Sequence, residues 1–418
     1  MDDLFGGRVA ILGLGYIGLP TAVALATRGI EVIGVDINDA IVEAVSLGKV
    51  PFVEPDLAIA VSGAVSVGGL TATTVVPEAD AFIIAVPTPF LDDRTADLSY
   101  VRNAVAQIAP MLRSGNLVVL ESTSPPGTTD QVSRWLGDLR PDLRLPHEAD
   151  GLSDIFVAHC PERVLPGRIM IEMITNDRVI GGVTRRCADK AASLYRVFTQ
   201  GQILTTDASS AEMAKLVENA YRDVNIAFAN ELSLISERLR LDVWEIIRLA
   251  NHHPRVNILT PGPGVGGHCI AVDPWFIVGA APDLARLIRT AREVNDSKPL
   301  HVARQVVEKA SRFREPTIAC LGLTFKANID DMRESPAVDV VVAIADAGPE
   351  LDIRVVEPFT TRLPAELAGR PNVRLQGLSE AIDEADIVVL LVDHDQFKTF
   401  PKSRLEGRVI FDTRGAWR

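Results

Sequence analysis

The start of the chain constrains its fold more strongly than any other segment. Residues 9–27 contain no charged side chain, a run of 19 residues that is long enough to cross a membrane or to belong to an export signal. Gly13, Gly15, Gly18 and Pro20 interrupt this run. Their positions favour a buried strand, a glycine turn and a buried helix over a membrane span.

The glycines follow the pattern GxGxxG, with Gly13, Gly15 and Gly18 lying between a predicted strand at 8–12 and a predicted helix at 16–28. In this context Gly13 permits a tight turn, Gly15 lets the backbone approach a pyrophosphate, and Gly18 allows close packing of helix on strand. The helix N-terminus attracts the anion. The pattern therefore indicates a dinucleotide site rather than a glycine turn without a ligand.

Asp36 indicates which dinucleotide binds. It ends the next predicted strand, 31–35, and comes 18 residues after Gly18. Its carboxylate would accept hydrogen bonds from the adenosine ribose and would repel a 2′-phosphate. We therefore expect NAD as the cofactor rather than NADP.

Strand and helix patterns alternate in both outer parts of the chain, which predicts an α/β fold with two Rossmann-like, doubly wound parallel sheets. The further predicted strands are 81–86, 117–121, 155–158, 178–181, 317–322, 353–356, 387–392 and 409–412. The second part repeats the first: Glu357 in RVVEPF corresponds to Asp36 in VIGVDI. Because the second part lacks the three-glycine pattern, we expect a different ligand there.

The middle of the chain has no strand pattern of its own. It contains a long helical pattern at 211–239, shorter ones at 243–250 and 284–294, and a Pro/Gly-rich loop at 253–267. We therefore expect three domains: an NAD-binding domain at 1–206, a central helical, dimerisation domain with a long helix at 207–300, and a C-terminal Rossmann-like domain with the different ligand at 301–418.

Composition excludes some classes of function. The 55 acidic and 42 basic side chains give a net charge of −13, the wrong sign for a sequence-independent nucleic-acid binder. The four cysteines include no CxxC pair, so neither a zinc knuckle nor a dithiol motif is indicated and we expect no metal. Sparse cysteines in a chain of this length favour a reducing, cytoplasmic location.

Cys269 follows a glycine-dense loop, Gly262–Gly267, in which backbone amides can approach a substrate. Its thiolate could act as a nucleophile, or the residue could be an inert buried cysteine. The other three cysteines are expected to be inert. Asp273, just before a proline, is by itself an ordinary turn former.

Lys215, Asn219 and Asp223 recur every four residues on the long predicted helix and therefore share one face. A solvated polar stripe is one interpretation. The apolar residues on either side indicate instead that the helix is buried, and a buried lysine requires a partner or a function.

Seven segments together resemble the UDP-sugar 6-dehydrogenases, the family of UDP-glucose and UDP-mannose-type dehydrogenases. They are GLGYIGLP at 13–20, ESTSPPGTT at 121–129, HCPERVLPG at 159–167, EMAKLVENAYRDVNIAFANE at 212–231, NHHPRVNILTPGPGVGGHCIAVDPWFIV at 251–278, FKANIDDMRESPA at 325–337 and the terminal FDTRGAWR. The matches keep the family's order over practically the whole chain, which is more specific than any single motif.

The resemblance implies a four-electron oxidation, in which a C6 primary alcohol becomes a carboxylate and two NAD⁺ are used in succession. Cys269 would attack the intermediate aldehyde, and oxidation of the thiohemiacetal would give a thioester that water hydrolyses. Lys215 would stabilise the developing oxyanion, and Asn219 would help to form the anion hole.

Three further residues have catalytic roles by the same resemblance. Asp273 and Thr123 would position water and take part in proton transfer, and Glu162 would assist hydrolysis of the thioester. The UDP-glucose enzymes usually carry a second glutamate four residues after the first, where this chain has Pro166. Either the remaining carboxylate of Glu162 is sufficient for hydrolysis of the thioester, or the attacking water is activated in a different way.

The resemblance also implies two sets of binding residues. Those at the cofactor are Gly13, Gly15, Tyr16, Ile17, Gly18, Asp36, Pro87, Thr88, Thr123 and Arg333. Those at the UDP-sugar are Glu162, Arg163, Val164, Lys215, Asn219, Arg255, Gly266, Lys326 and Arg414. Arg255 would reach the substrate across the interface of a homodimer formed through the central helix, although each arginine could also be an ordinary exposed charge.

Pro166, together with His268 where the glucose enzymes commonly have serine, resembles the N-acetylhexosamine branch of the family. The implied reaction is oxidation of UDP-N-acetyl-D-mannosamine to UDP-N-acetyl-D-mannosaminuronate, a precursor of surface polysaccharide. A UDP-N-acetylglucosamine or UDP-glucose 6-dehydrogenase is the nearest alternative. A two-electron hydroxy-acid dehydrogenase and a non-catalytic nucleotide-sugar-binding regulator are remoter ones.

Overall fold

The computed structural model describes residues 5–52, 54, 56–91, 93–148, 152–164, 167–267 and 269–418. Pro166 and His268, on which the expected substrate partly depends, lie outside the described residues. Contacts divide the chain into two compact units, Met1–Glu218 and Asn219–Arg418. No helix in the described ranges is long and apolar enough to cross a membrane.

The first unit contains a mixed sheet with the strand order β3-β2-β1-β4-β5-β6-β7-β8. The strands are β1 Val9–Leu12, β2 Val32–Val35, β3 Leu70–Thr73, β4 Ala81–Ile84, β5 Leu117–Leu120, β6 Phe156–His159, β7 Arg178–Gly182 and β8 Ile203–Asp207. The helices are α1 Gly18–Ala26, α2 Asp39–Ser46, α3 Leu57–Ser66, α4 Ser99–Ile108, η1 Ala109–Met111, α5 Thr128–Leu139, α6 Ile169–Thr175 and α7 Arg185–Tyr195.

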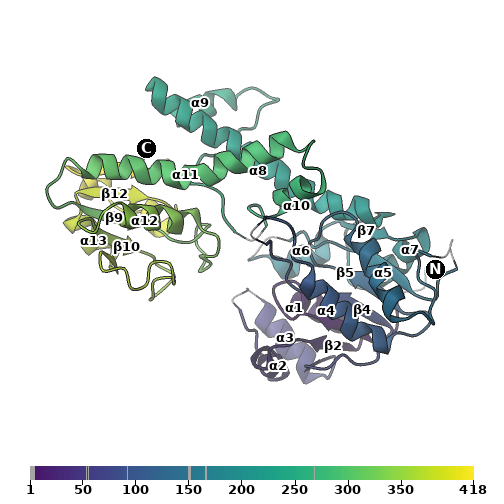
Figure 1. Cartoon of the computed structure of the whole chain (residues 1–418). Coiled ribbons are helices and arrows are strands. Elements are labelled where there is room, and N and C mark those ends of the chain that lie inside the picture. The colour runs from purple at the N-terminus through teal and green to yellow at the C-terminus, as the bar shows by residue number, and fades with distance from the viewer. Residues whose placement is uncertain are drawn as a thin grey trace. The chain divides into compact units, whose positions relative to one another are not determined.

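Helices cover both faces of this sheet (Figure 1). On β1, Val9 and Ile11 belong to a core with α1, α3, α6 and α7, whereas Ala10 and Leu12 belong to a second core with α4 and α5. Alternate residues of a strand point to opposite faces, so a strand covered on both sides must be apolar throughout. This is why β1, β4 and β5 are continuous apolar runs.

The α/β prediction is confirmed, with one difference in strand direction. The pairs from β3 to β6 are all parallel, but β6 and β7 pair antiparallel through Ala158 and Gly182, and β8 then pairs parallel with β7. The last two strands therefore run against the others, which an apolar pattern cannot reveal because it carries no information about direction.

The second unit begins inside the long helix α8, Ala208–Leu239, and contains a parallel sheet with the order β11-β10-β9-β12-β13. Its strands are β9 Thr317–Leu321, β10 Asp352–Val356, β11 Val373–Leu375, β12 Ile387–Leu390 and β13 Val409–Asp412. Its other helices are α9 Val243–Ala250, α10 Asp273–Ala280, α11 Arg286–Ala310, α12 Pro336–Ala347, α13 Leu378–Glu384, α14 Asp395–Lys398 and η2 Lys402–Leu405.

Helix α11 is longer than the predicted 284–294 because it continues past Pro299. Proline usually disrupts a helix. Beyond it, however, Val302 and Val306 are buried in one core with α12 and β9, and burial of these side chains favours continuation of the helix. The other face of this sheet is covered by α13 and the segment around Phe397.

Candidate active site

The glycine turn between β1 and α1 has the geometry that a dinucleotide requires. Gly13 has φ +96°, and a Cβ there would lie 2.5 Å from the carbonyl oxygen of Ala85. A Cβ on Gly18 would lie 1.9 Å from the carbonyl oxygen of Gly13. A Cβ on Gly15, by contrast, would meet no described heavy atom within 4 Å, so the backbone is open where a pyrophosphate would approach.

Asp36 follows β2 and binds the glycine turn directly. Its Oδ2 accepts a hydrogen bond from the amide of Leu14 over 2.9 Å, and its Oδ1 accepts one from the amide of Asn38 over 2.9 Å. The carboxylate keeps lone pairs with which it can bind a ribose. Tyr16 stacks on Phe52 with ring centroids 4.2 Å apart, and Ile17 is the N-cap residue of α1.

Three of the predicted cofactor residues lie in the loops that follow β4 and β5. Pro87 is exposed, and the hydroxyl of Thr88 donates a hydrogen bond to the carbonyl oxygen of Thr123 over 2.6 Å. The two loops are thereby joined at the carboxyl ends of neighbouring parallel strands. Ligands of open α/β sheets bind at this edge.

Glu162 lies in the segment after β6 and is almost fully buried. One of its carboxylate oxygens lies 3.0 Å from the guanidinium of Arg178 on β7. Arg163 donates to the carbonyl oxygen of Asp177 over 2.6 Å, and Val164 packs against the core. The ion pair between Glu162 and Arg178 holds the expected catalytic carboxylate in one place.

A second carboxylate, Glu121 at the end of β5, shares this buried environment and was not predicted. It accepts hydrogen bonds from the hydroxyls of Tyr195, over 3.0 Å, and Thr21, over 3.1 Å. Burial, reinforced by the charge of Glu162 and opposed by Arg178, raises the pKa of Glu121 to about 7. Its position inside the ESTSPPGTT motif is the only sequence signal that could have singled it out.

Glu212 is another buried carboxylate that sequence reasoning missed. It accepts hydrogen bonds from the amides of Gly127, over 2.6 Å, and Thr129, over 2.7 Å, and one from the Thr129 hydroxyl, over 2.6 Å. Burial raises its pKa to about 7 in spite of these bonds. It thereby caps the start of α5 and joins the Thr123 loop to α8, where it lies three residues before Lys215.

The repeated polar residues of α8 do not form a solvated stripe. Lys215 is 7% exposed and Asp223 is fully buried. Asn219 donates from Nδ2 to Oδ2 of Asp273 over 2.6 Å, whereas Asp223 pairs with Arg292 over 2.6 Å. The structure thus joins two of the predicted catalytic residues, Asn219 and Asp273, and gives Asp223 a different partner.

Cys269 is exposed, whereas the other three cysteines are buried. Burial raises the pKa of the thiols of Cys160 and Cys320 to about 12, so they are inert at neutral pH. Asp273, which passes for a turn former in the sequence, is the first residue of α10. The reason is that a proline at the second position fits the first turn of a helix, where its missing amide costs nothing.

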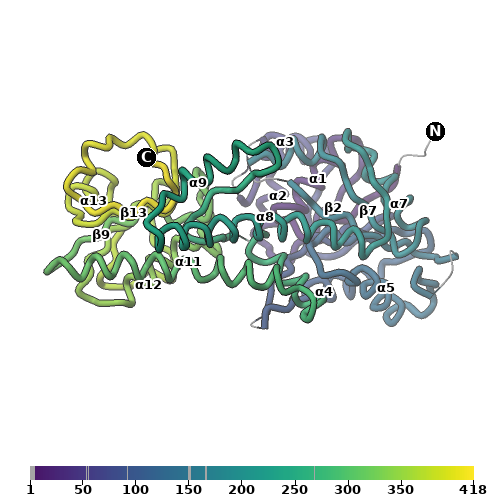
Figure 2. The backbone as a smooth tube through the Cα atoms, turned by 90° about the horizontal axis from the view of Figure 1, so that it is seen from above, coloured from purple at the N-terminus to yellow at the C-terminus, as the bar shows by residue number. Residues whose placement is uncertain are grey.

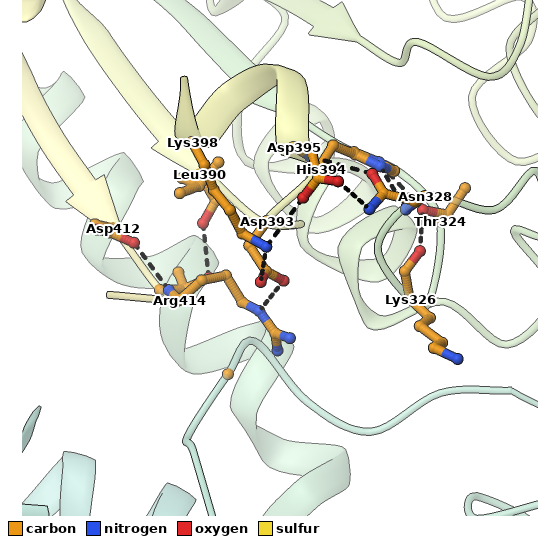
Figure 3. A network of polar contacts seen from close by, with 12 residues as sticks. Thr324, Lys326, Asn328, Leu390, Asp393, His394, Asp395, Lys398, Asp412 and Arg414 are labelled. Atoms are coloured by element: carbon orange, nitrogen blue, oxygen red, sulfur yellow. Dashed lines mark hydrogen bonds and ion pairs between the residues drawn. The ribbon is translucent and has the colours of Figure 1, made fainter. Parts of the chain in front are cut away.

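Two of the predicted substrate-binding cations, Lys326 and Arg414, follow strands β9 and β13 of the second unit. Figure 3 shows Arg414, after β13, beside Asp393, to which its Nε donates over 3.0 Å. Lys326 is exposed, and only its carbonyl oxygen takes part in the drawn network. Arg333 pairs with Asp331 over 2.7 Å, and Arg255 is exposed in the loop after α9.

The second unit contains a counterpart of the Asp36 interaction. Glu357, after β10, accepts a hydrogen bond from the amide of Leu323 over 2.7 Å, as Asp36 does from Leu14. Here, however, the carboxylate also lies 3.3 Å from Nε2 of His394, and both side chains are fully buried. The carboxylate that corresponds to Asp36 therefore has a buried imidazole as an additional partner, in which it differs from Asp36.

Among the described residues, no group of three or more His, Cys, Asp or Glu side chains is arranged to hold a metal ion. The donors that the site does present are amides, hydroxyls, a thiol and single carboxylates. These groups suit an organic substrate and a dinucleotide.

The chain matches three domains of the UDP-glucose/GDP-mannose dehydrogenase family: the NAD binding domain at residues 7–199, the central domain at 209–297 and the UDP binding domain at 319–418. An NDP-N-acetyl-D-galactosaminuronic acid dehydrogenase of Ralstonia nicotianae is 58% identical over 99% of this chain and 97% of its own length. A UDP-N-acetyl-D-mannosamine dehydrogenase of Campylobacter jejuni is 55% identical over 93% of this chain and 96% of its own.

A solved structure shows the same architecture. The UDP-D-ManNAc dehydrogenase of Pyrococcus horikoshii is similar with a TM-score of 0.87 and 38% identity, over 98% of this chain and 96% of that protein. The resemblance inferred from the seven motifs is confirmed by these relatives.

Proposed function

Because this chain belongs to the UDP-glucose/GDP-mannose dehydrogenase family and is an NAD-dependent UDP-sugar dehydrogenase, we propose that it oxidises UDP-N-acetyl-D-mannosamine at C6 to the uronate. The proposed reaction converts one alcohol, two NAD⁺ and one water into one carboxylate, two NADH and three protons. The bond between Asn219 and Asp273, together with the exposed thiol of Cys269, is the observation that carries the proposal.

The proposed site residues have separate roles in binding the cofactor and in the covalent step. The turn from Gly13 to Gly18 and the carboxylate of Asp36 would hold NAD, which when bound supplies the hydride acceptor. Cys269 forms a thiohemiacetal with the aldehyde, and oxidation of the thiohemiacetal gives a thioester. Lys215 is a nearly buried cation, and a cation in a dry site stabilises a developing oxyanion more strongly than one in water.

Proton transfer and hydrolysis fall to the polar residues. Asp273, held by Asn219, is the carboxylate proposed to orient water. Glu162, held by Arg178, is the carboxylate proposed for thioester hydrolysis. Thr123, joined to Thr88 through its carbonyl oxygen, supports the cofactor side of the site.

The relatives favour an N-acetylhexosamine as the sugar, and mannosamine is supported by the enzyme at 55% identity. The relative at 58% identity is named for a galactosaminuronic acid, so a UDP-N-acetylgalactosamine 6-dehydrogenase is the second candidate. Lys326 and Arg414, with Arg255 and Arg333, are the cations proposed to bind the diphosphates.

We also propose that the protein is a cytoplasmic homodimer. Along α8, Tyr221, Phe228, Ile235 and Leu239 leave apolar side chains exposed at spacings of four and seven residues, as in a helix that packs against a partner. Four cysteines without a CxxC pair in a chain of this length favour a reducing, cytoplasmic location. We propose three domains at 1–206, 207–300 and 301–418, and the ends of the three family matches support these boundaries.

The proposal is tested by measuring NADH release with a panel of UDP-ManNAc, UDP-GalNAc, UDP-GlcNAc, UDP-glucose and UDP-galactose. We expect two NADH for each UDP-ManNAc consumed and a lower kcat/KM for the other sugars. Release of a single NADH would refute the four-electron reaction. A higher kcat/KM for UDP-GalNAc would replace the proposed substrate with the second candidate.

A further inference from the structure

A buried polar network joins α8 to α11 inside the second unit. Arg292 donates from its guanidinium to Oδ1 of Asp223 over 2.6 Å, and Asn295 donates from Nδ2 to the same oxygen over 2.8 Å. All three side chains are at most 1% exposed. Figure 2 shows the two helices side by side along this stretch. Burial of so many polar atoms is costly unless each is held in a defined geometry.

The network continues beyond the two helices and ends on the backbone of the Cys269 loop. Oδ1 of Asn295 accepts a hydrogen bond from Nδ2 of Asn230 over 2.8 Å. Oδ1 of Asn230 in turn accepts one from the amide of Gly262 over 2.9 Å. Because both ends of the Asn230 amide are engaged, its orientation is determined and it holds Gly262 at a definite distance from α8.

The far end of the same loop is attached to the same helix. Asp273 accepts the hydrogen bond of Asn219, which lies about three helical turns before Asn230 on α8. The segment that contains Cys269 is therefore fixed to α8 at both ends. Between these ends the loop packs closely on the segment before α12, since a Cβ on Gly266 would lie 2.1 Å from the carbonyl oxygen of Glu334.

We propose that Asn230 is a positioning residue for Cys269, acting through the amide of Gly262 on the loop that carries the thiol. The inference rests on the proposed function, in which this thiol attacks the aldehyde. Covalent attack requires the reacting atoms to approach to about 3–3.5 Å, and a displacement of about 1 Å can reduce the rate by about 10²-fold. A loop fixed at both ends meets that requirement.

Only part of the reaction depends on this geometry. The first oxidation converts the alcohol and one NAD⁺ into the aldehyde, one NADH and one proton, and the thiol takes no part in it. In the second oxidation the thiol first adds to the aldehyde and forms the thiohemiacetal. The thiohemiacetal and a second NAD⁺ then give the thioester, NADH and a proton. Finally, water hydrolyses the thioester to the carboxylate, a proton and the free thiol. A displaced thiol therefore slows the second oxidation and leaves aldehyde behind.

The test compares Asn230→Leu, which keeps the size of the side chain but removes both hydrogen bonds, with the wild-type enzyme. We expect its ratio of NADH to sugar consumed to fall from two toward one, with aldehyde captured by a hydroxylamine trap, and kcat to fall by at least about tenfold. Hydrogen exchange at Gly262 should accelerate. A ratio of two at the wild-type rate would overturn the inference.

Val306→Ala is the matched control, because it removes packing from α11 but lies in the core of the C-terminal sheet. It should retain a ratio of two, since the ratio does not depend on the fraction of enzyme that is folded. If Asn230→Leu does not fold, Asn295→Ala breaks the network one link further away. In that variant the ratio of NADH to sugar consumed should also fall from two toward one. An unchanged ratio would refute the role of the network.

Failure of the proposed function is recognised separately. If the wild-type enzyme itself releases one NADH per sugar, the four-electron reaction is wrong. The positioning of the loop is then judged by alkylation of Cys269 with iodoacetamide, whose rate should change by about threefold or more in Asn230→Leu and not in Val306→Ala. Equal rates in all three proteins would reject the positioning role as well.

Discussion

Asn219 on α8 donates a hydrogen bond from Nδ2 to Oδ2 of Asp273 at the start of α10, and the two atoms are 2.6 Å apart. The bond joins residues that are 54 positions apart in the sequence. Asp273 is 2% exposed and Asn219 is partly buried, so bulk water has little access to the carboxylate. A carboxylate held in this way can orient a water molecule or exchange a proton with it.

We predict that Asp273→Asn lowers kcat by about 10²–10⁴-fold, the range expected for loss of a group in proton transfer. The asparagine keeps an amide oxygen that can accept the bond from Asn219, so the fold should be retained. Asp283→Asn, an exposed carboxylate in the loop after α10, is the control and should leave kcat within about twofold. Equal activity of the two variants, measured as initial rates of NADH release, would remove Asp273 from the mechanism.

The central strands of both sheets and the edge strand β13 could be predicted from the sequence, whereas the edge strands β3, β8 and β11 could not. β1, β4 and β5 are four-residue apolar runs that are buried at every position. β3, LTAT, and β8, ILTTD, lie at the two edges of the first sheet and are partly exposed. An edge strand packs against fewer neighbours and can be polar, so it loses the pattern that identifies a strand.

The residues of the candidate site could likewise be predicted from the sequence only in part. Cys269 and Lys215 could be singled out because the family resemblance implies a role for each. Glu121 and Glu212 lie in two of the same quoted motifs, but their environments are set by partners 74 and 83 positions away, at Tyr195 and Thr129. Local spacing cannot reveal such pairs, because they form only when separate strands and helices pack together.

The assignment of the nucleophile predicts a large difference between two cysteine variants. Cys269→Ser should lower the rate of NADH release in the second oxidation by about 10³-fold, because a serine hydroxyl is hardly ionised near neutral pH. Cys187→Ser should keep nearly the wild-type rate, since Cys187 is buried in α7 and its sulfur accepts a hydrogen bond from the Thr184 hydroxyl. Rates that were equal in the two variants would show that Cys269 is not the nucleophile.

Glu121 predicts a particular dependence of stability on pH. Its pKa rises from the ordinary value of 4.5 to about 7 on folding. Between these values the folded chain holds a proton that the unfolded chain has released, so stability falls as the pH rises through this window. Glu121→Gln keeps the shape of the side chain but removes its ionisable group. Relative to the wild type, its free energy of unfolding should increase by up to about 1.4 kcal/mol per pH unit between pH 4.5 and 7.

The measurement is the difference in urea unfolding between the two proteins at several pH values. Glu212, whose pKa is also raised to about 7, and His159, whose pKa burial lowers to about 3, titrate in both proteins and cancel in the difference. A difference that stays constant from pH 4.5 to 7 would mean that Glu121 is ionised throughout in the folded protein.

Glu212→Ala should destabilise the first unit. It removes the acceptor of the buried amide of Thr129 and the partly buried amide of Gly127, and a buried amide left without a partner costs about 1–3 kcal/mol. Thermal unfolding should detect this loss, and Glu212→Gln, which keeps one carbonyl oxygen, should lose less. Glu231→Ala, an exposed glutamate on the same helix, is the control and should unfold like the wild type. Similar stability of both alanine variants would contradict the capping role.

The exposed apolar side chains of α8 predict how the proposed homodimer can be broken. Phe228→Glu would place a carboxylate in an apolar interface, where its desolvation should raise the dimer Kd by at least about 10²-fold. Light scattering after size exclusion should give twice the chain mass of 45.2 kDa for the wild type and a single chain for the variant. Leu47→Glu, at an exposed position after α2, should remain dimeric. A monomeric wild type, or a dimeric Phe228→Glu, would reject α8 as the interface.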